Sequence, residues 1–308
     1  MILQRLGAVL LVCLPVACTT GISSNPASSI PDRIVTERGG FIPEGIEYDT
    51  RNSRFLTGSL SDGSIYEISN SGRLRVVVTD EALMSSVGIE VDEMRNRLLV
   101  ANADRRAGTG AALLGIYDLA TGDRLAMVDL SGSIENPPAD ANYFANDVAI
   151  SAAGTAFVTD TRMNIIYKVD RYFKPSVLLD LGQNSGFNLN GIEYHPEGYL
   201  IVVSSGSGQL LKVPVNNPQR WSLVALDFPA AGGDGLVWAA DGGLVSTSNN
   251  TSSVMKYASD DHWASAGLTG MASFTGQATT AAAVGDDIFV VQPHFADDDP
   301  PVILRARF

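Results

Sequence analysis

The chain has 308 residues, 45% of them hydrophobic, which is enough to bury a large core within a single all-β domain. Its 21 basic and 34 acidic residues give a formal net charge of −13. Such a surface repels phosphate backbones and anionic lipid headgroups. Nucleic acid is therefore not an expected partner.

The first eighteen residues resemble an export signal. One basic residue, Arg5, precedes an apolar run from Leu6 to Ala17, which is too short to span a bilayer comfortably. The cysteine at position 18 follows a small residue, as at a bacterial lipoprotein cleavage site, and acylated Cys18 would be the new N-terminus. Pro15 departs from the leucine usual in such signals, so cleavage and secretion is the alternative. We expect an exported protein, either a periplasmic or cell-envelope lipoprotein or a secreted one, whose only membrane contact is this anchor.

Both cysteines, Cys13 and Cys18, lie in this segment, so no disulfide is expected in the folded domain. Residues 19–33 are rich in Ser, Thr, Pro and Gly, which is typical of a flexible tether. The folded domain is expected over residues 34–308.

The domain consists of short alternating apolar runs separated by Gly, Asp, Asn or Ser, which is the pattern of strands and turns. No long stripe with a helical period occurs, so little or no helix is expected. Clear strand candidates are Arg54–Leu60, Arg97–Ala101, Thr155–Thr159, Tyr199–Ser204 and Asp287–Val291.

A short motif recurs along the domain. It has a leading residue, then a residue that favours turns, then alternating apolar positions. Five copies and a weaker sixth begin at Glu44, Val87, Asn146, Asn190, Asp234 and Thr280, with spacings of 43, 59, 44, 44 and 46 residues. A period in the forties is that of propeller blades. We predict an all-β fold, a six-bladed β-propeller with four-stranded antiparallel blades around a central channel, and an insertion at Arg105–Ala112 or Ser131–Asn142.

Equivalent positions in a propeller lie at one height around the axis, so the leading residues should converge. Four of the six carry oxygen donors: Glu44, Asn146, Asn190 and Asp234. Two carboxylates and two amides suit a hard divalent cation, most of all Ca²⁺, and not zinc. Each residue alone is also explained by turn chemistry. Their shared repeat position favours a metal site.

Other catalytic motifs are missing from the sequence. There is no Gly-x-Ser-x-Gly elbow, no His-Glu-x-x-His, no phosphate-binding glycine loop and no dinucleotide fingerprint. Five residues at or near the ends of expected strands are candidates for the wall of a substrate pocket: Asn102, Asp104, Phe144, Asp160 and Ser205.

The Pro-Glu-Gly-Ile segment at Pro43–Ile46 and the pairs that begin at Asn146, Asn190 and Asp234 occur in this order over residues 35–308. This set resembles the gluconolactonase and regucalcin (senescence marker protein) family, related in architecture to paraoxonases and diisopropylfluorophosphatase. The resemblance implies that Glu44, Asn190 and Asp234 bind a divalent cation. It also implies that Asn146 binds metal or substrate and that Asp234 is the general base or nucleophile.

One position departs from this family. Its sugar lactonases usually have arginine two residues before the first asparagine, and here that residue is Phe144. A less polar lactone or ester is therefore favoured over a sugar acid lactone.

Taken together, these observations predict a monomeric, metal-dependent hydrolase that opens a lactone or related ester, with Asp234 and Asn146 as catalytic residues and a small molecule as substrate. The alternative is a non-catalytic envelope propeller that binds a protein or glycan and holds a structural cation. A related reaction on phosphotriesters, or bond formation without hydrolysis, is also open.

Overall fold

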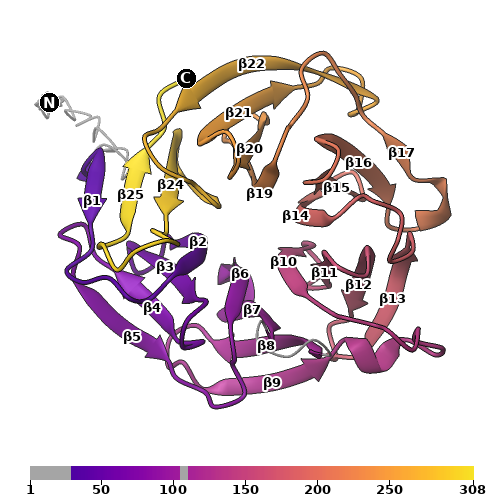
Figure 1. The fold of residues 1–308 in the computed structure, drawn as a ribbon, viewed down its shortest axis with the longest axis horizontal. Helices are drawn as coiled ribbons and strands as arrows, with labels where there is room; N and C mark the ends of the chain where they lie inside the picture. The colour runs from indigo at the N-terminus through magenta and orange to yellow at the C-terminus, as the bar shows by residue number, and fades with distance from the viewer. Residues whose placement is uncertain (1–28, 105–109) are drawn as a thin grey trace, which may run out of the picture.

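The computed structural model describes residues 29–104 and 110–308. Within these residues, six sheets form a ring around a central axis (Figure 1). Blade 1 contains β2 (Pro43–Asp49), β3 (Arg54–Ser59), β4 (Ile65–Ile68) and β5 (Leu74–Val78). Blade 2 contains β6 (Ser86–Asp92), β7 (Arg97–Ala103), β8 (Ala112–Asp118) and β9 (Arg124–Asp129). Blade 3 contains β10 (Ala145–Ile150), β11 (Ala156–Asp160), β12 (Ile165–Val169) and β13 (Pro175–Asp180).

The second half of the ring repeats this meander. Blade 4 contains β14 (Leu189–His195), β15 (Tyr199–Ser204), β16 (Gln209–Pro214) and the short β17 (Ser222–Leu223). Blade 5 contains β19 (Gly233–Trp238), β20 (Leu244–Ser248), β21 (Ser253–Ala258) and β22 (Ser265–Ser273), with β18 (Ala225–Leu226) added in parallel to β22. Blade 6 contains β23 (Ala281–Val284), β24 (Asp287–Gln292) and β25 (Val302–Arg305).

The ring closes because blade 6 takes its outermost strand from the start of the domain. Strand β1 (Arg33–Val35) pairs with β25, and Ile34 lies opposite Ile303. Arg305 reinforces this closure through an ion pair with Asp32, with 2.8 Å between Nε and Oδ1. Both ends of the domain are therefore held in one sheet (Figure 1).

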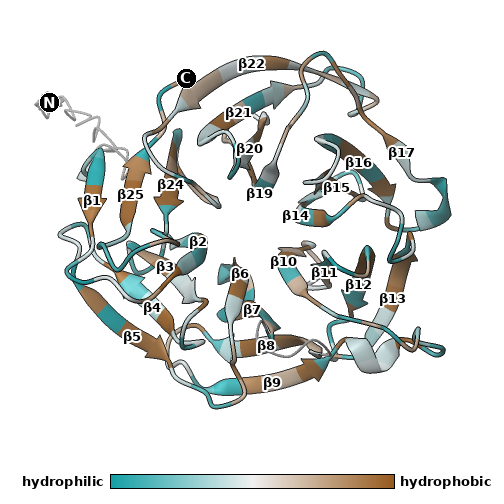
Figure 2. Ribbon diagram, in the orientation of Figure 1, coloured by the Kyte–Doolittle hydropathy of each residue, from teal (hydrophilic) through white to brown (hydrophobic). Residues whose placement is uncertain are grey.

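Hydrophobic side chains fill the spaces between adjacent blades. One buried cluster lies at each of the six junctions, for example around Phe55 and Phe289 between blades 1 and 6, and around Phe157 and Leu200 between blades 3 and 4. Figure 2 shows the corresponding hydrophobic stretches along strands of every blade. Because both faces of each sheet are covered in this way, packing between blades supplies most of the stabilisation.

The fold class predicted from the repeats is confirmed. The recurring motifs form the innermost strands β2, β6, β10, β14 and β19, which surround the axis, and the sixth copy leads into β23 (Figure 1). Apart from Ser29, which has 3-10 geometry, helix in the described residues is limited to the 3-10 turns η2 (Glu93–Arg95), η3 (Ser131–Ser133) and η4 (Pro218–Arg220). None of these described helices is long and apolar enough to cross a bilayer.

The long second interval of the repeat falls on two connections of blade 2. The connection from β9 to β10 runs from residue 130 to residue 144 and includes η3. The β7–β8 connection contains Arg105–Thr109, which lie outside the described residues, as do the expected signal segment, Cys18 and most of the expected tether.

Candidate functional site

The four oxygen-bearing leading residues lie at the start of inner strands that meet at the axis. Glu44, Asn146 and Asp234 are buried, with exposed fractions of 7%, 6% and 8%, and Asn190 is partly exposed. The Asn190 amide nitrogen donates a hydrogen bond to Asp234 Oδ1 at 2.7 Å, so blades 4 and 5 meet at this level. On the other side of the ring, the Glu44 carbonyl accepts a hydrogen bond from Thr279 Oγ1 at 2.8 Å.

Three of these leading residues are supported by a side chain fifteen positions later in the same blade. Thr161 accepts a hydrogen bond from Asn146 Nδ2 at 2.7 Å. Ser205 accepts one from Asn190 Nδ2 at 3.1 Å. In blade 5, Asn249 instead donates through Nδ2 to Asp234 Oδ2 at 3.2 Å. Each support lies just after the second strand of its blade, so the propeller repeat sets both partners.

These contacts fix how the two axial amides are turned. A carboxylate only accepts hydrogen bonds, so the atom of Asn190 that faces Asp234 must be the nitrogen. Within the described residues, no donor reaches the carbonyl oxygen of Asn190 or of Asn146. The two amide oxygens and the Asp234 carboxylate offer hard oxygens on three successive blades, and Glu44 stands at the same repeat position in blade 1. This donor set fits a divalent cation such as Ca²⁺.

Two influences act on the pKa of Asp234. Burial raises the pKa of its carboxyl from 3.8 to about 6, while the amide hydrogen bonds from Asn249 and Asn190 lower it. The raised pKa reflects the cost of burying a negative charge. Asp234 is thus a carboxylate that would gain stability from a bound cation.

A β-bulge shapes the start of five inner strands. The register with the second strand slips between Pro43 and Ile46 in blade 1, and at the matching place in blades 2 to 5. Each bulge contains the leading residue and the residue after it. Bulges re-aim side chains and are common next to functional sites, and here every oxygen-bearing leading residue lies in one.

The second motif position is glycine in four blades because neighbouring inner strands approach closely. A Cβ on Gly191 would lie 2.4 Å from the Asp234 carbonyl oxygen, and one on Gly45 would lie 2.7 Å from the Val87 carbonyl oxygen. Neither glycine has a positive φ. Turn preference, the basis of the sequence interpretation, is therefore not the reason for these glycines; contact between blades is.

Blade 3 has Asp147 where these blades have glycine. Its carboxylate accepts hydrogen bonds from the Val148 backbone N–H at 2.9 Å and from the Ile192 N–H of blade 4 at 3.1 Å. Burial raises the pKa of Asp147 to about 7. Asp147 therefore connects two inner strands directly beside the candidate metal ligands.

A second acidic level lies three residues further along the inner strands. Burial and, to a smaller extent, the charge of the nearby Asp147 carboxylate raise the pKa of Glu47 to about 8. The pKa values of Glu90 and Glu193 are also raised, first by burial and then by the charge of Glu47. Three carboxyl groups from blades 1, 2 and 4 thus share the channel. The sequence analysis missed this level, although glutamate stands at the fourth motif position in all three copies.

An apolar cluster lies near the start of the inner strands. Leu60, Val87 and Ala103 form a small buried cluster, and Ile42, Phe144 and Phe295 pack against it. Leu60, Val87 and Ala103 come from blades 1 and 2, Phe144 directly precedes the inner strand of blade 3, and Phe295 comes from blade 6. Hydrocarbon from several blades therefore lies near the start of the inner strands, where the oxygen-bearing leading residues also stand.

Two of the predicted pocket residues are buried and accept hydrogen bonds from backbone N–H groups, so they do not line an open pocket. Asn102 and Asp160 are fully buried. Asn102 Oδ1 accepts from the Met84 N–H at 3.0 Å, and Asp160 Oδ1 accepts from the Phe144 N–H at 3.0 Å. Each side chain thereby fixes the loop that precedes the inner strand of its blade.

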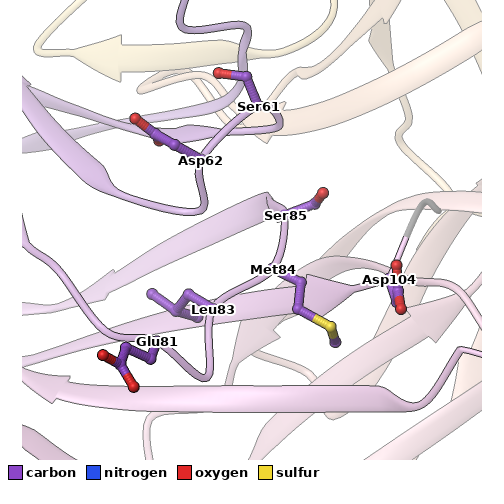
Figure 3. A pocket seen from close by; sticks show the side chains of 7 residues that line it. All are labelled: Ser61, Asp62, Glu81, Leu83, Met84, Ser85 and Asp104. Atoms are coloured by element: carbon purple, nitrogen blue, oxygen red, sulfur yellow. The ribbon is translucent and has the colours of Figure 1, made fainter. Parts of the chain in front are cut away.

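The other predicted pocket residues lie on the same face of the ring. Ser205 supports Asn190 and also donates a hydrogen bond to the Gly233 carbonyl. Asp104 lines a cavity of about 430 Å³ between the loops of blades 1 and 2, opposite Ser61 and Asp62 (Figure 3). Its remaining lining is Glu81, Leu83, Met84 and Ser85. The structure thus places Asp104 in a cavity and Ser205 beside the axial residues.

One group of possible metal ligands in the described residues lies on the connection between β24 and β25. The ligand atoms of His294, Asp297 and Asp299 lie within 4.8 Å of one another, and His294 Nδ1 is 3.2 Å from Asp297 Oδ1. Both aspartates are exposed on the β24–β25 loop. Exposed acidic groups of this kind occur often without an ion.

An arginine that the sequence analysis missed lies beside Phe144. The Arg162 guanidinium carbon lies 4.8 Å from the centre of the Phe144 ring. Arg162 follows Thr161, the support of Asn146. No sequence signal marks this contact, because the two partners are eighteen residues apart on different connections of blade 3.

Comparison of the sequence with known protein families gives no match, and comparison with curated protein sequences gives none either. Solved structures do match. The major allergen Mala s 1 of Malassezia sympodialis superposes with a TM-score of 0.75 at 16% identity, over 91% of this chain and 97% of the allergen. What the two chains share is the propeller fold.

Structures from the family suggested by the motifs match as well. A gluconolactonase from Xanthomonas campestris has a TM-score of 0.63 at 17% identity, with 87% of each chain covered. Regucalcin from Agrobacterium tumefaciens, described as a calcium-binding protein, has a TM-score of 0.63 at 19% identity, over 91% of this chain and 96% of its own. A streptogramin B lyase and a luciferin-regenerating enzyme also share the fold.

Proposed function

We propose that this protein is a metal-dependent hydrolase that opens a lactone or a related ester. One observation carries the proposal: the amide nitrogens of Asn146 and Asn190 are tied to neighbouring side chains, which leaves both carbonyl oxygens for a ligand beside the Asp234 carboxylate. A turn or a packing contact does not require this arrangement. An oxygen-coordinated cation does.

Glu44, Asn146, Asn190 and Asp234 would hold the cation, and Ca²⁺ suits the donor set best because it tolerates ligands from separate blades. A bound divalent cation polarises a carbonyl group and stabilises the negative charge that develops on its oxygen. Asp234 accepts a proton from the attacking water or attacks the carbonyl carbon itself, roles that require its ionised form. Asn146 orients the substrate.

The apolar cluster near the start of the inner strands suits an ester that has a hydrocarbon part. Phe295 and Ile42 are its partly buried members from blades 6 and 1, and the proposed ligands start the inner strands of blades 1, 3, 4 and 5. Burying apolar surface on one side while holding the reactive group on the other positions the ester for attack. The fold shared with a gluconolactonase and a calcium-binding regucalcin supports the same proposal.

The experiment is hydrolysis of γ-butyrolactone, δ-valerolactone and phenyl acetate by the full-length chain, with added Ca²⁺ or with a chelator. We expect Asp234→Asn to lower kcat by at least about 100-fold, the usual contribution of a positioned base. Asp241→Asn is the matched control, because Asp241 is exposed in the β19–β20 turn of the same blade and pairs with Lys256. Its activity should equal that of the native protein.

Activity that is independent of Ca²⁺, or that survives in Asp234→Asn, would contradict this proposal. If no substrate is hydrolysed and the chelator only lowers the melting temperature, the result favours the alternative, a binding propeller with a structural ion.

A further inference from the structure

The charge balance of the buried arginines identifies one that lacks a carboxylate partner. Five arginines in the described residues are buried or partly buried. Four of them pair with aspartate: Arg54 with Asp49, Arg95 and Arg97 with Asp92, and Arg305 with Asp32. The fifth, Arg162, forms no ion pair with any described residue.

Neutral groups hold Arg162 in place. Its Nη1 donates a hydrogen bond to Asn142 Oδ1 at 2.8 Å. Its guanidinium group lies over the Phe144 ring, which attracts a cation without neutralising it. Within the described residues, no acceptor contacts Nε or Nη2. One edge of a fixed, planar cation is therefore left for a ligand.

The position of Arg162 ties this edge to the candidate active site. The preceding residue, Thr161, binds the Asn146 amide. Phe144 stands two residues before Asn146, and its backbone N–H shares the Asp160 Oδ1 acceptor with the N–H of Arg162. Residues at the end of β11 in blade 3 therefore position both the guanidinium group of Arg162 and the side chain of Asn146.

We propose that Arg162 binds a carboxylate of the substrate, so that the hydrolase acts on lactones or esters that carry a negative charge. A guanidinium group matches a carboxylate with two parallel hydrogen bonds. In a protein of net charge −13, an unpaired arginine beside Phe144 also favours an anion that the surface would otherwise repel. This proposal deepens the function proposed above and rests on it.

The test compares two lactones that differ in one carboxylate, 5-oxotetrahydrofuran-2-carboxylate and γ-valerolactone. Both are supplied to the full-length chain with Ca²⁺. We expect Arg162→Gln to lower kcat/KM for the carboxylated lactone about tenfold more than for the neutral one, the usual effect of losing a charge-assisted pair. Arg162→Lys should recover part of the preference, since it restores the charge but not the two-pronged contact.

The matched control is Arg171→Gln. Arg171 also lies over an aromatic ring, that of Tyr172 at 4.7 Å, but it is exposed in the β12–β13 turn. This variant should keep the native preference. Equal losses on both lactones in Arg162→Gln, or a native preference for the neutral lactone, would overturn the proposal.

If neither lactone is hydrolysed, the proposed function fails, and the role of Arg162 is then decided by binding. Saturation-transfer NMR with the carboxylated lactone and Ca²⁺ would show a signal in the native protein and in Arg171→Gln but not in Arg162→Gln. The same signal in all three proteins, or none in the native protein, refutes the Arg162 site.

Discussion

At the scale of single residues, two opposing effects determine the pKa of Asp234. Burial disfavours its charge, while hydrogen bonds from Asn249 and Asn190 favour it, and the net result is a pKa of about 6. Protons would therefore compete with the proposed cation for the same carboxylate. The outcome of this competition depends on pH in a range where an ordinary aspartate stays ionised.

We predict that Ca²⁺ affinity rises about tenfold between pH 5 and pH 7, because the Asp234 carboxyl loses its proton as pH passes its pKa of about 6. Isothermal titration calorimetry at several pH values measures this. In Asn249→Ala, the lost amide donor raises the pKa of Asp234 further, so the same rise should occur at higher pH. A flat affinity from pH 5 to pH 7 would show that Asp234 does not bind the ion.

The sequence aligns the four leading residues because they recur at one position of the repeat, and their role as metal ligands stays a prediction. It could not show their supports, Thr161 and Ser205, as a set, since a hydroxyl is common at strand ends. The contact of Arg162 with Phe144 could not be predicted from the sequence either. The departure at Phe144 suggested a less polar substrate, but that ring is the platform over which a cation from another loop lies.

At the scale of elements, the inner strands combine a bulge with close contact between blades. The bulge turns the leading residue, and the glycine that follows it allows the neighbouring strand to approach. The sequence shows the glycines, but their cause is tertiary: a Cβ on Gly235 would lie 2.4 Å from Thr280 Oγ1 of the next blade. The sequence motif shows where a glycine occurs, but only the packing of neighbouring blades explains why glycine is needed there.

We predict that Gly191→Ala lowers the free energy of unfolding by about 1–3 kcal/mol, the usual cost of overpacking, because its Cβ would meet the Asp234 carbonyl oxygen at 2.4 Å. Gly267→Ala is the control, since the nearest atom there is Asp227 Oδ2 at 3.3 Å. Urea unfolding with a chelator present compares the two. Equal effects would mean that the inner strands can separate to admit a methyl group.

At the scale of the whole molecule, some properties of the ring come from the regular repeat, and others come from contacts between residues that are far apart in the sequence. The blade number followed from the period of the repeat. The closure of the ring by β1 could not be predicted from this period. Arg33–Val35 pairs with β25 across almost the full length of the chain, and the sequence of a short strand does not indicate its partner. The acidic channel is a third property of the ring as a whole, since Glu47, Glu90 and Glu193 face one another only once it has closed.

This channel makes stability depend on pH. The pKa of Glu47 is raised from 4.5 to about 8, so the folded state holds a proton that the unfolded chain releases. The stabilisation is complete below about pH 4.5 and is lost as pH rises toward 8. Glutamine keeps the shape of the side chain and stays neutral. Glu47→Gln should therefore unfold at higher urea concentration than the native protein at pH 8, by at least about 1 kcal/mol, the value of one pKa unit.

At pH 5 most of this advantage should disappear, because Glu47 is then protonated in the folded native protein as well. Glu135→Gln is the control, since Glu135 is exposed on the β9–β10 connection and should change stability little at either pH. The measurement uses chelator throughout, so that bound cation does not mask the effect. Should Glu47→Gln prove no more stable than the native protein at pH 8, Glu47 would be ionised in the channel and the charges there would be neutralised by other means.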